Sequence, residues 1–403
     1  MLNSDGKLLF TTRIVRLFAY GFLSVILALY LAQVGLSETA IGTLFTFTLL
    51  GDAGISLWLT TSADRIGRKR MLLLGAALMI IAGIVFAFTG DFIWLTIAAI
   101  IGVISPGGGE IGPFLSIEQA ALSEIIPNDQ RTRVFAWYNL VGSFATATGA
   151  LISGSLAQFF QANGLTPLAS YRVNVIGYAL IGLVLAALFS QLSSKVETIH
   201  LNTTNKIGLH RSRGIVMKLS ALFALDAFAG GFIVQSLIAY WFQIRWGVEP
   251  AILGSIFFGA NILAGISALS AARIASRIGL INTMVFTHIP SNILLMLVPL
   301  MPNLPLAIFV LLVRYSISQM DVPTRQSYTM AVVDPDERSA ASGITTIARS
   351  LGAAWSPAIT SVLIGASMLT APFFLAGGLK IVYDLTLWQS FRAHKPPEER
   401  QPR

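Results

Sequence analysis

Isolated ionisable residues interrupt the long apolar stretches of this sequence, and they are the side chains that could do chemistry. Such a group costs at least ~2.5–3.5 kcal/mol to place at the centre of a bilayer, so it usually faces a cavity or a charged partner. A desolvated carboxyl group can hold a proton near neutral pH, whereas a guanidinium keeps its charge. The candidates for substrate or proton binding are Asp52, Glu110, Glu118, Asp226, Arg314, Asp321 and Arg349.

Two of these carboxyl groups lie beside glycines. Glu110 lies in the segment 105–113, where a run of three consecutive glycines between two prolines disfavours a regular helix. Such a segment needs protein or cavity water for its freed backbone groups, although a kink for helix packing would explain it equally. Asp226 precedes Gly230 and Gly231. It is a candidate for proton coupling or substrate binding, with a static ion pair as the alternative.

Charge spacing suggests further pairings. Arg314 and Asp321 are seven residues apart, which places both on one face of a continuous helix. Arg314 could anchor an anionic substrate, or it could neutralise Glu110 or Asp226. Lys380 and Asp384 are four residues apart, and we expect them to pair with each other.

The composition indicates a membrane protein, whose transmembrane helices would position these groups. The chain has 403 residues, of which 55% are hydrophobic and 11% charged, whereas soluble domains carry about 25% charged residues. An ordinary soluble enzyme is excluded, and continuous apolar runs disfavour a β-barrel. We predict an all-α membrane protein with twelve transmembrane helices of about 20 residues each. The predicted spans cover residues 13–34, 40–61, 71–89, 92–123, 134–160, 169–192, 216–243, 250–272, 280–301, 304–326, 340–365 and 370–391.

The distribution of basic residues predicts the orientation. With both termini in the cytoplasm, most of the 27 Lys and Arg residues, Arg16 and Arg325 among them, fall on the cytoplasmic side, and Arg172 and Arg245 alone fall in outer loops. This positive-inside pattern predicts a multi-pass protein of the plasma (inner) membrane. It also explains the net charge of +8 without nucleic acid as a partner.

The two halves of the chain repeat each other. The sequence at 17–19 recurs at 222–224, 65–67 recurs at 277–279, and Asp129 and Arg131 recur as Asp336 and Arg338. The polar stretch 193–214 separates the copies. We therefore predict pseudo-symmetric six-helix halves at 1–192 and 215–403, joined by a cytoplasmic central loop at 193–214, with a solute site between the halves near the midplane.

The loop between the second and third spans carries a motif. Residues 60–70 resemble motif A of the major facilitator superfamily, Gly-x-x-x-Asp-Arg-x-Gly-Arg-Lys, with Thr60 in place of the first glycine. The matching residues are Asp64, Arg65, Gly67, Arg68 and Lys69. Residues 123–133 look like the end of span four in this family. The resemblance covers the whole chain and implies that spans one, four, seven and ten line the cavity.

The resemblance also implies a gate. Asp64, Arg68 and Glu124 would form a charge relay that stabilises the outward-open state, and Gly67 permits the tight turn. In span five, the glycines at 149 and 154 resemble a motif of proton-coupled drug antiporters in a degraded form, because Ala150 replaces its proline. Packing of small residues between helices is the alternative explanation.

These patterns predict a secondary active transporter that moves a small solute by alternating access, with proton-coupled efflux by antiport as the first interpretation. Proton symport or uniport for uptake remains an alternative, as does a non-transporting sensor or assembly protein with the same fold. We expect neither an enzyme nor a cofactor, since no nucleophile–base pair or phosphate loop is present. The four scattered histidines predict no metal site. By resemblance, the protein is expected to be a monomer in the lipid bilayer.

Overall fold

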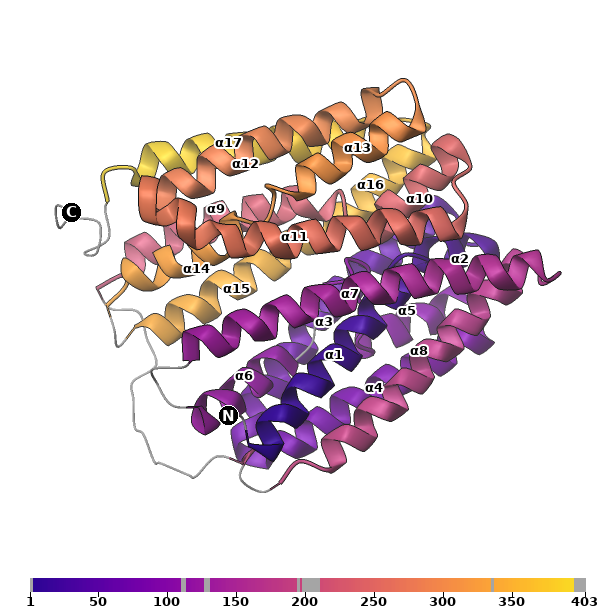
Figure 1. Cartoon of the computed structure of the whole chain (residues 1–403), viewed down its shortest axis with the longest axis horizontal. Coiled ribbons are helices and arrows are strands. Elements are labelled where there is room, and N and C mark those ends of the chain that lie inside the picture. The colour runs from indigo at the N-terminus through magenta and orange to yellow at the C-terminus, as the bar shows by residue number, and fades with distance from the viewer. Residues whose placement is uncertain are drawn as a thin grey trace. The chain divides into compact units, whose positions relative to one another are not determined.

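The computed structural model describes residues 3–109, 114–126, 131–193, 196–197, 211–334 and 337–394, and within these ranges the chain forms helices and no strands (Figure 1). Eight helices or continuous helical stretches are long and apolar enough to cross a membrane, and a bent pair, α1 (Ser4–Ser24) and α2 (Leu27–Val34), makes a ninth. Each of the twelve predicted spans coincides with one described helix or with consecutive helices. The all-α membrane fold is therefore confirmed.

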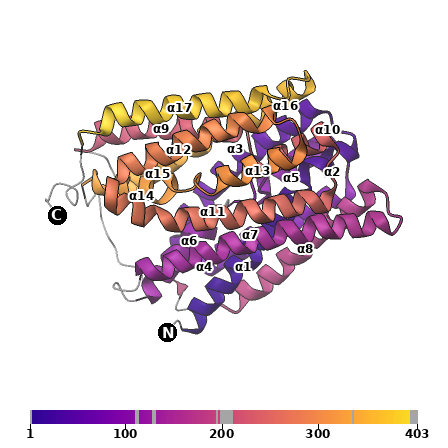
Figure 2. The ribbon, with the colours of Figure 1, turned by 45° about the horizontal axis from the view of Figure 1, so that its top comes forward.

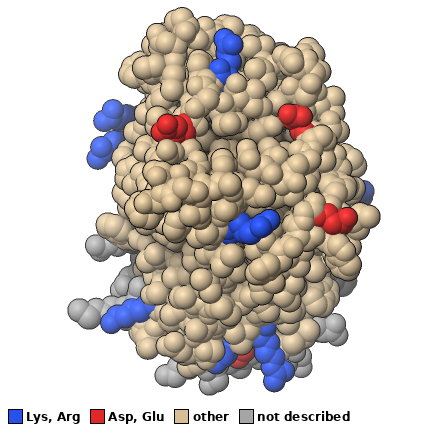
Figure 3. Space-filling model, turned by 90° about the vertical axis from the view of Figure 1, so that its right-hand side faces the viewer, with Lys and Arg blue, Asp and Glu red and all other residues tan. Residues whose placement is uncertain are grey.

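The surface fits a lipid solvent. Large apolar side chains such as Phe88, Trp94 and Phe309 are more than half exposed. The face in Figure 3 carries single, scattered charged side chains on an otherwise uncharged surface. Contact of this apolar surface with the hydrocarbon of a bilayer is favourable, whereas its exposure to water would cost free energy.

The described residues divide into two compact units. Unit 1 comprises residues 1–201 and 234–262, and unit 2 comprises residues 202–233 and 263–403. Unit 1 thus contains a segment that the sequence repeat assigns to the second half. The division of the chain at the central loop stays a prediction.

Unit 1 is a bundle in which α1 packs on α7 and α8, α4 packs on α8, and α3 packs on α5. Three of these helices have N-cap residues. The side chains of Ser37, Asp91 and Thr166 accept hydrogen bonds from backbone N–H groups in the first turns of α3, α5 and α8. Its further helices are α3 (Glu38–Ile66), α4 (Arg68–Phe88), α5 (Phe92–Ile101), α6 (Phe114–Ile125), α7 (Arg131–Ala162), α8 (Pro167–Ser190), α10 (Gln235–Trp246) and the first part of α11 (Pro250–Ile278).

Unit 2 is built around α9, which packs on α15 and α17, while α12 packs on α13, α14 and α17 (Figure 2). Its core holds Leu219, Phe223, Met284, Tyr328 and Tyr383, all of them buried. Besides the end of α11, its elements are α9 (Arg213–Gly231), α12 (Leu280–Leu297), the 3-10 turn η3 (Val298–Leu300), α13 (Leu304–Tyr315), α14 (Asp321–Ala331), α15 (Arg338–Ala354), α16 (Ser356–Gly365) and α17 (Ala371–Phe391).

Several spans are broken within the apolar region. Span four stops at Ile101 and resumes at Phe114, and Gly108 in the described part of the gap has a φ of +68°. The prediction that the glycine-rich segment cannot hold a regular helix is confirmed there. Span ten is broken between Tyr315 and Asp321. The expectation of one continuous helix through Arg314 and Asp321 was therefore wrong, because these residues lie on two successive helices, α13 and α14.

Candidate functional site

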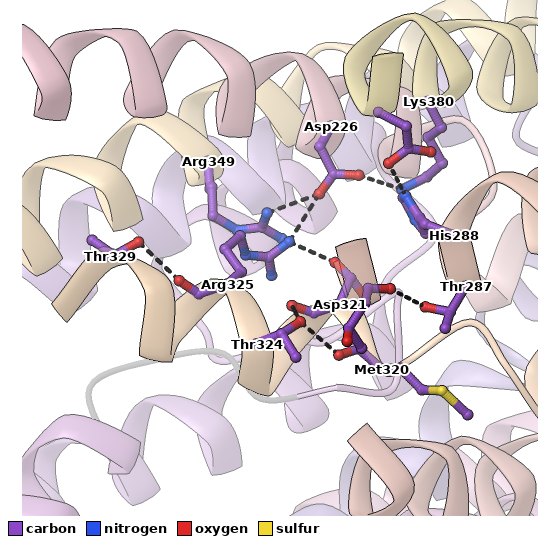
Figure 4. A network of polar contacts seen from close by, with 12 residues as sticks. Asp226, Thr287, His288, Met320, Asp321, Thr324, Arg325, Thr329, Arg349 and Lys380 are labelled. Carbon is purple, nitrogen blue, oxygen red and sulfur yellow. Dashed lines mark hydrogen bonds and ion pairs between the residues drawn. The ribbon is translucent and has the colours of Figure 1, made fainter. Parts of the chain in front are cut away.

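A cluster of buried charges centres on Asp226, in the C-terminal part of α9 (Figure 4). Its side chain is only 3% exposed. One carboxylate oxygen, Oδ1, accepts from Nζ of Lys380 on α17 at 2.6 Å. The other, Oδ2, accepts from Nη1 of Arg349 on α15 at 2.9 Å and from Nη1 of Arg325 on α14 at 3.2 Å. A single carboxylate therefore ties together four helices.

The cluster carries an excess of positive charge. Arg325 also donates through Nη1 to Oδ2 of Asp321, one helical turn earlier on α14, at 2.8 Å. Two carboxylates thus face three cations. The side chains of Arg325 and Lys380 are 8% and 10% exposed, whereas that of Arg349 is 32% exposed. Arg349 is the most exposed cation of this cluster.

The pairing of Lys380 differs from the sequence expectation. Lys380 donates to Asp226, while Asp384 accepts from Nδ2 of Asn292 at 3.1 Å and lies 2.8 Å from Nδ1 of His288. The predicted Lys380–Asp384 ion pair was therefore wrong. The physical reason is that α17 packs against both α9 and α12, so that each of the two side chains meets a partner across a helix–helix contact.

Arg314 lies apart from these pairs near the end of α13. Its residue is only 7% exposed, and its guanidinium carbon lies 4.9 Å from the centre of the Tyr315 ring. Among the described contacts, neither its Nε nor the buried Oγ of Ser318 has a hydrogen-bond partner. Asp226 interacts with Lys380 and two other cations, and Asp321 interacts with Arg325. The alternative that Arg314 neutralises Asp226 was therefore wrong, and Glu110, the other carboxylate considered for this role, lies outside the described residues.

Unit 1 has a smaller buried charge cluster at Glu118 on α6. Arg16 on α1 forms a bidentate pair with it, with distances of 2.7 Å from Nη1 to Oε1 and 2.8 Å from Nη2 to Oε2. Thr12 donates to Oε1 at 2.8 Å, and the hydroxyl of Tyr138 donates to Oε2. Both members of the ion pair are completely buried.

Sequence reasoning missed the two arginines that complete these clusters. Arg16 and Arg325 were assigned to the cytoplasmic side because they lie near the ends of apolar stretches. Both are buried, at 0% and 6% exposure. A usable signal was present for Arg325, because Asp321 lies four residues before it, the spacing of a helical ion pair. No local signal marks Arg16, whose partner lies about a hundred residues away in the chain.

The structure gives fewer contacts for the two remaining carboxyl candidates, Asp52 and Glu110. Asp52 on α3 is half-buried and accepts from Oγ of Ser56 at 3.2 Å. Glu110 lies outside the described residues. Among the described residues, no group of three or more His, Cys, Asp or Glu side chains could hold a metal ion.

The gating motif surrounds the turn between α3 and α4. Gly67 has a φ of +115°, which favours glycine, so the predicted tight turn is present. The backbone N–H groups of Arg68 and Lys69 donate to Glu197 at 2.7 Å and 3.3 Å, and Nη1 of Arg68 donates to the carbonyl of Val196 at 3.3 Å. This carboxylate satisfies free N–H groups at the start of α4. The side chains of the remaining motif residues, Asp64, Arg65 and Glu124, lie outside the described part of the structure, so the charge relay stays a prediction.

Comparisons with known proteins agree with this architecture. The chain is 29% identical over 419 residues to the uncharacterized membrane protein YJR124C of Saccharomyces cerevisiae, covering 96% of this chain and 93% of that protein. The fold is similar to a bacterial homolog of the human lysosomal transporter Spinster, with a TM-score of 0.74, 13% identity and coverage of 97% and 98% of the two chains. It is also similar to the nucleoside transporter NupG, with a TM-score of 0.71, 13% identity and coverage of 97% and 100%.

The family assignment covers most of the sequence. The family model of the Major Facilitator Superfamily matches residues 9–357. Together with the apolar helices, this match identifies a multi-pass integral membrane protein that is a transporter and not an enzyme. The chain belongs to the Major Facilitator Superfamily.

Proposed function

We propose that this chain is a secondary active transporter that moves a small solute by alternating access and couples this movement to protons, with efflux by antiport as the first assignment. The observation that carries the proposal is the cluster at Asp226, in which one buried carboxylate holds Lys380, Arg349 and Arg325 from three other helices. We further propose a monomer in the plasma (inner) membrane with cytoplasmic termini.

The cluster can couple to protons if its contacts change during the cycle. Its three cations favour the charged form of Asp226 in this arrangement, so a proton binds to Asp226 only where those cations have moved away. A buried carboxylate with three cationic partners is a costly arrangement, and removing its charge would leave those cations without their common counter-ion. Arg349 is the most exposed of the three and would be released first. Protonation of Asp226 would therefore change which arrangement of α9, α14, α15 and α17 is favoured, and an alternating-access cycle requires two such arrangements.

Two other functions fit the same fold. Symport for uptake would use the same residues to move the solute and the proton in the same direction. Uniport would use them to move the solute without a proton. A non-transporting sensor would have little reason to keep four intramembrane charges together at Asp226. The buried cluster therefore favours transport over sensing.

The proposal is tested with Asp226→Asn in proteoliposomes. A growth screen of a deletion strain against toxic compounds, with and without the protein, first supplies a solute. The amide keeps the size of the carboxylate but removes the charge, so we expect proton-driven net transport to fall at least about tenfold while solute exchange without a gradient continues. Glu249→Gln, at an exposed position outside the cluster, serves as the matched control.

Proton-driven transport by Asp226→Asn at the wild-type rate would remove Asp226 from the coupling mechanism. A wild-type protein that binds the solute but never moves it across the membrane would favour the sensor instead.

A further inference from the structure

We infer that Arg314 and Ser318, at the break in span ten, form the docking point for an anionic group of the transported solute, a carboxylate or a phosphate. The inference rests on the proposed transport function and adds to it the chemical class of the substrate. It is carried by two buried polar side chains, because the Nε of Arg314 and the Oγ of Ser318 have no hydrogen-bond partner among the described residues.

Arg314 is a permanent positive charge that is almost completely buried. A guanidinium does not lose its proton in proteins, so its charge must be compensated by a neighbour. The residue is 7% exposed, and its described charge contact is the face of the Tyr315 ring, 4.9 Å from the guanidinium carbon. A cation–π contact offsets part of the desolvation cost but supplies no counter-charge.

The carboxylates on the described spans of unit 2 interact with other groups. Asp226 faces Lys380, Arg349 and Arg325. Asp321 faces Arg325, and Asp384 faces His288 and Asn292. No salt bridge of Arg314 occurs among the described residues, and in the proposed site an anionic group of the solute supplies the counter-charge.

Ser318 supplies a second recognition group four residues further along, in the turn between α13 and α14. Its hydroxyl is buried, and its Oγ has no hydrogen-bond partner among the described contacts. The chain turns tightly here, because the backbone N–H of Ile317 donates to the carbonyl oxygen of Arg314 at 3.2 Å. Arg314 and Ser318 are therefore close along one turn of the chain, and the proposed site places the guanidinium and the hydroxyl on one ligand.

The donor set defines the ligand chemistry. A guanidinium presents several N–H donors in a planar fork that matches two oxygens of a carboxylate or phosphate, and a hydroxyl adds one further donor. Neutral solutes would leave the charge uncompensated, and cations would be repelled. The geometry therefore selects anions.

The first experiment measures the missing counter-charge without any ligand. In the purified full chain, Ser318→Asp places a carboxylate one turn from Arg314, and Ser318→Asn is its uncharged match. We expect the thermal midpoint of Ser318→Asp to exceed that of Ser318→Asn by about 2 °C or more, and this difference to vanish in an Arg314→Gln background. Equal midpoints for Ser318→Asp and Ser318→Asn would show that Arg314 is already compensated and would overturn the inference.

The second experiment identifies the ligand class. Small molecules from a cell extract are separated on an anion-exchange resin into a retained fraction and a flow-through fraction. We expect the retained fraction to raise the thermal midpoint of the wild type, and Arg314→Gln to need at least about tenfold more of it for the same shift. Arg273→Gln, at an exposed position of α11 in the same unit, should respond like the wild type. Phosphatase treatment that abolishes the shift assigns a phosphate, and a shift that survives assigns a carboxylate.

The inference fails if the retained fraction gives no shift, if the flow-through gives the larger one, or if Arg314→Gln responds like the wild type. Transport distinguishes this failure from failure of the proposed function. Wild-type solute flux by Arg314→Gln in proteoliposomes overturns the anion site and leaves the transporter in place, whereas absence of flux in the wild type overturns the transporter.

Discussion

At the scale of single residues, Glu118 and Arg16 form a completely buried ion pair with two hydrogen bonds. Thr12 and Tyr138 donate to the same carboxylate. A buried ion pair with this degree of hydrogen bonding can be structural, but the sequence also makes Glu118 a candidate for proton or substrate binding. Mutation separates the two roles, since they predict different measurements.

If the pair is structural, removing one partner is more costly than removing both. Glu118→Gln leaves the Arg16 charge buried without its counter-ion and should destabilise the protein by about 3–5 kcal/mol, seen as a lower thermal midpoint. The double variant Arg16→Met with Glu118→Leu should lose less, because no buried charge remains. A Glu118→Gln protein of wild-type stability that has lost proton coupling would instead assign Glu118 to the transport mechanism.

At the scale of helices, small residues set the approach of α1 to α7. A Cβ atom at Gly149 would lie 2.1 Å from the carbonyl oxygen of Phe18, and one at Gly21 would lie 2.0 Å from that of Thr146. Distances this short leave room for a hydrogen atom and for nothing larger. Packing of small residues, the alternative explanation of the span-five glycines, thus has direct support at Gly149, and the likeness to antiporters is not needed to explain it.

Gly149→Ala should therefore force α1 and α7 apart. We expect a loss of about 1–3 kcal/mol, measured as a lower thermal midpoint and a smaller monodisperse fraction in size-exclusion chromatography. Gly54→Ala is the matched control, because a Cβ atom there meets nothing within 4 Å on the exposed side of α3. That substitution should be neutral or slightly stabilising. Equal thermal midpoints of the two variants would mean that α1 and α7 move apart to accommodate the added methyl group without a loss of stability.

At the scale of the whole molecule, the charges divide into two populations. Within the described ranges, intramembrane charges such as Asp226 and Glu118 lie in buried clusters inside each unit. Exposed charges such as Arg70 and Asp91 lie near helix ends. The first population bears on the transport chemistry, and the second bears on how the chain is oriented in the bilayer.

The proposed orientation is tested by chemical labelling, which is direct because the chain has no native cysteine. In intact cells, a membrane-impermeant maleimide should label Asp91→Cys, in the loop between α4 and α5, because that loop is expected outside. Arg70→Cys, at the start of α4, should be labelled only after permeabilisation. The reverse result would place the basic loops outside and contradict the cytoplasmic termini.

The sequence by itself determined the class, the family and the break in span four. Its low charge required a lipid solvent, the loop at Gly67 resembles the family motif, and the glycines before Glu110 excluded a regular helix. These features depend on composition and on neighbours along the chain, so local reasoning reaches them. The charge relay of Asp64, Arg68 and Glu124 stays a prediction.

The tertiary structure alone decided which charges meet. Lys380 has Asp384 four residues away but donates to Asp226 on another helix, and Arg16 meets Glu118 across a helix contact. Ion pairing depends on the rotation and depth of each packed helix, which the apolar periodicity of a lipid-exposed helix defines poorly. The same packing leaves Arg314 without a salt bridge among the described residues, a fact that no reading of its neighbours in the sequence could supply.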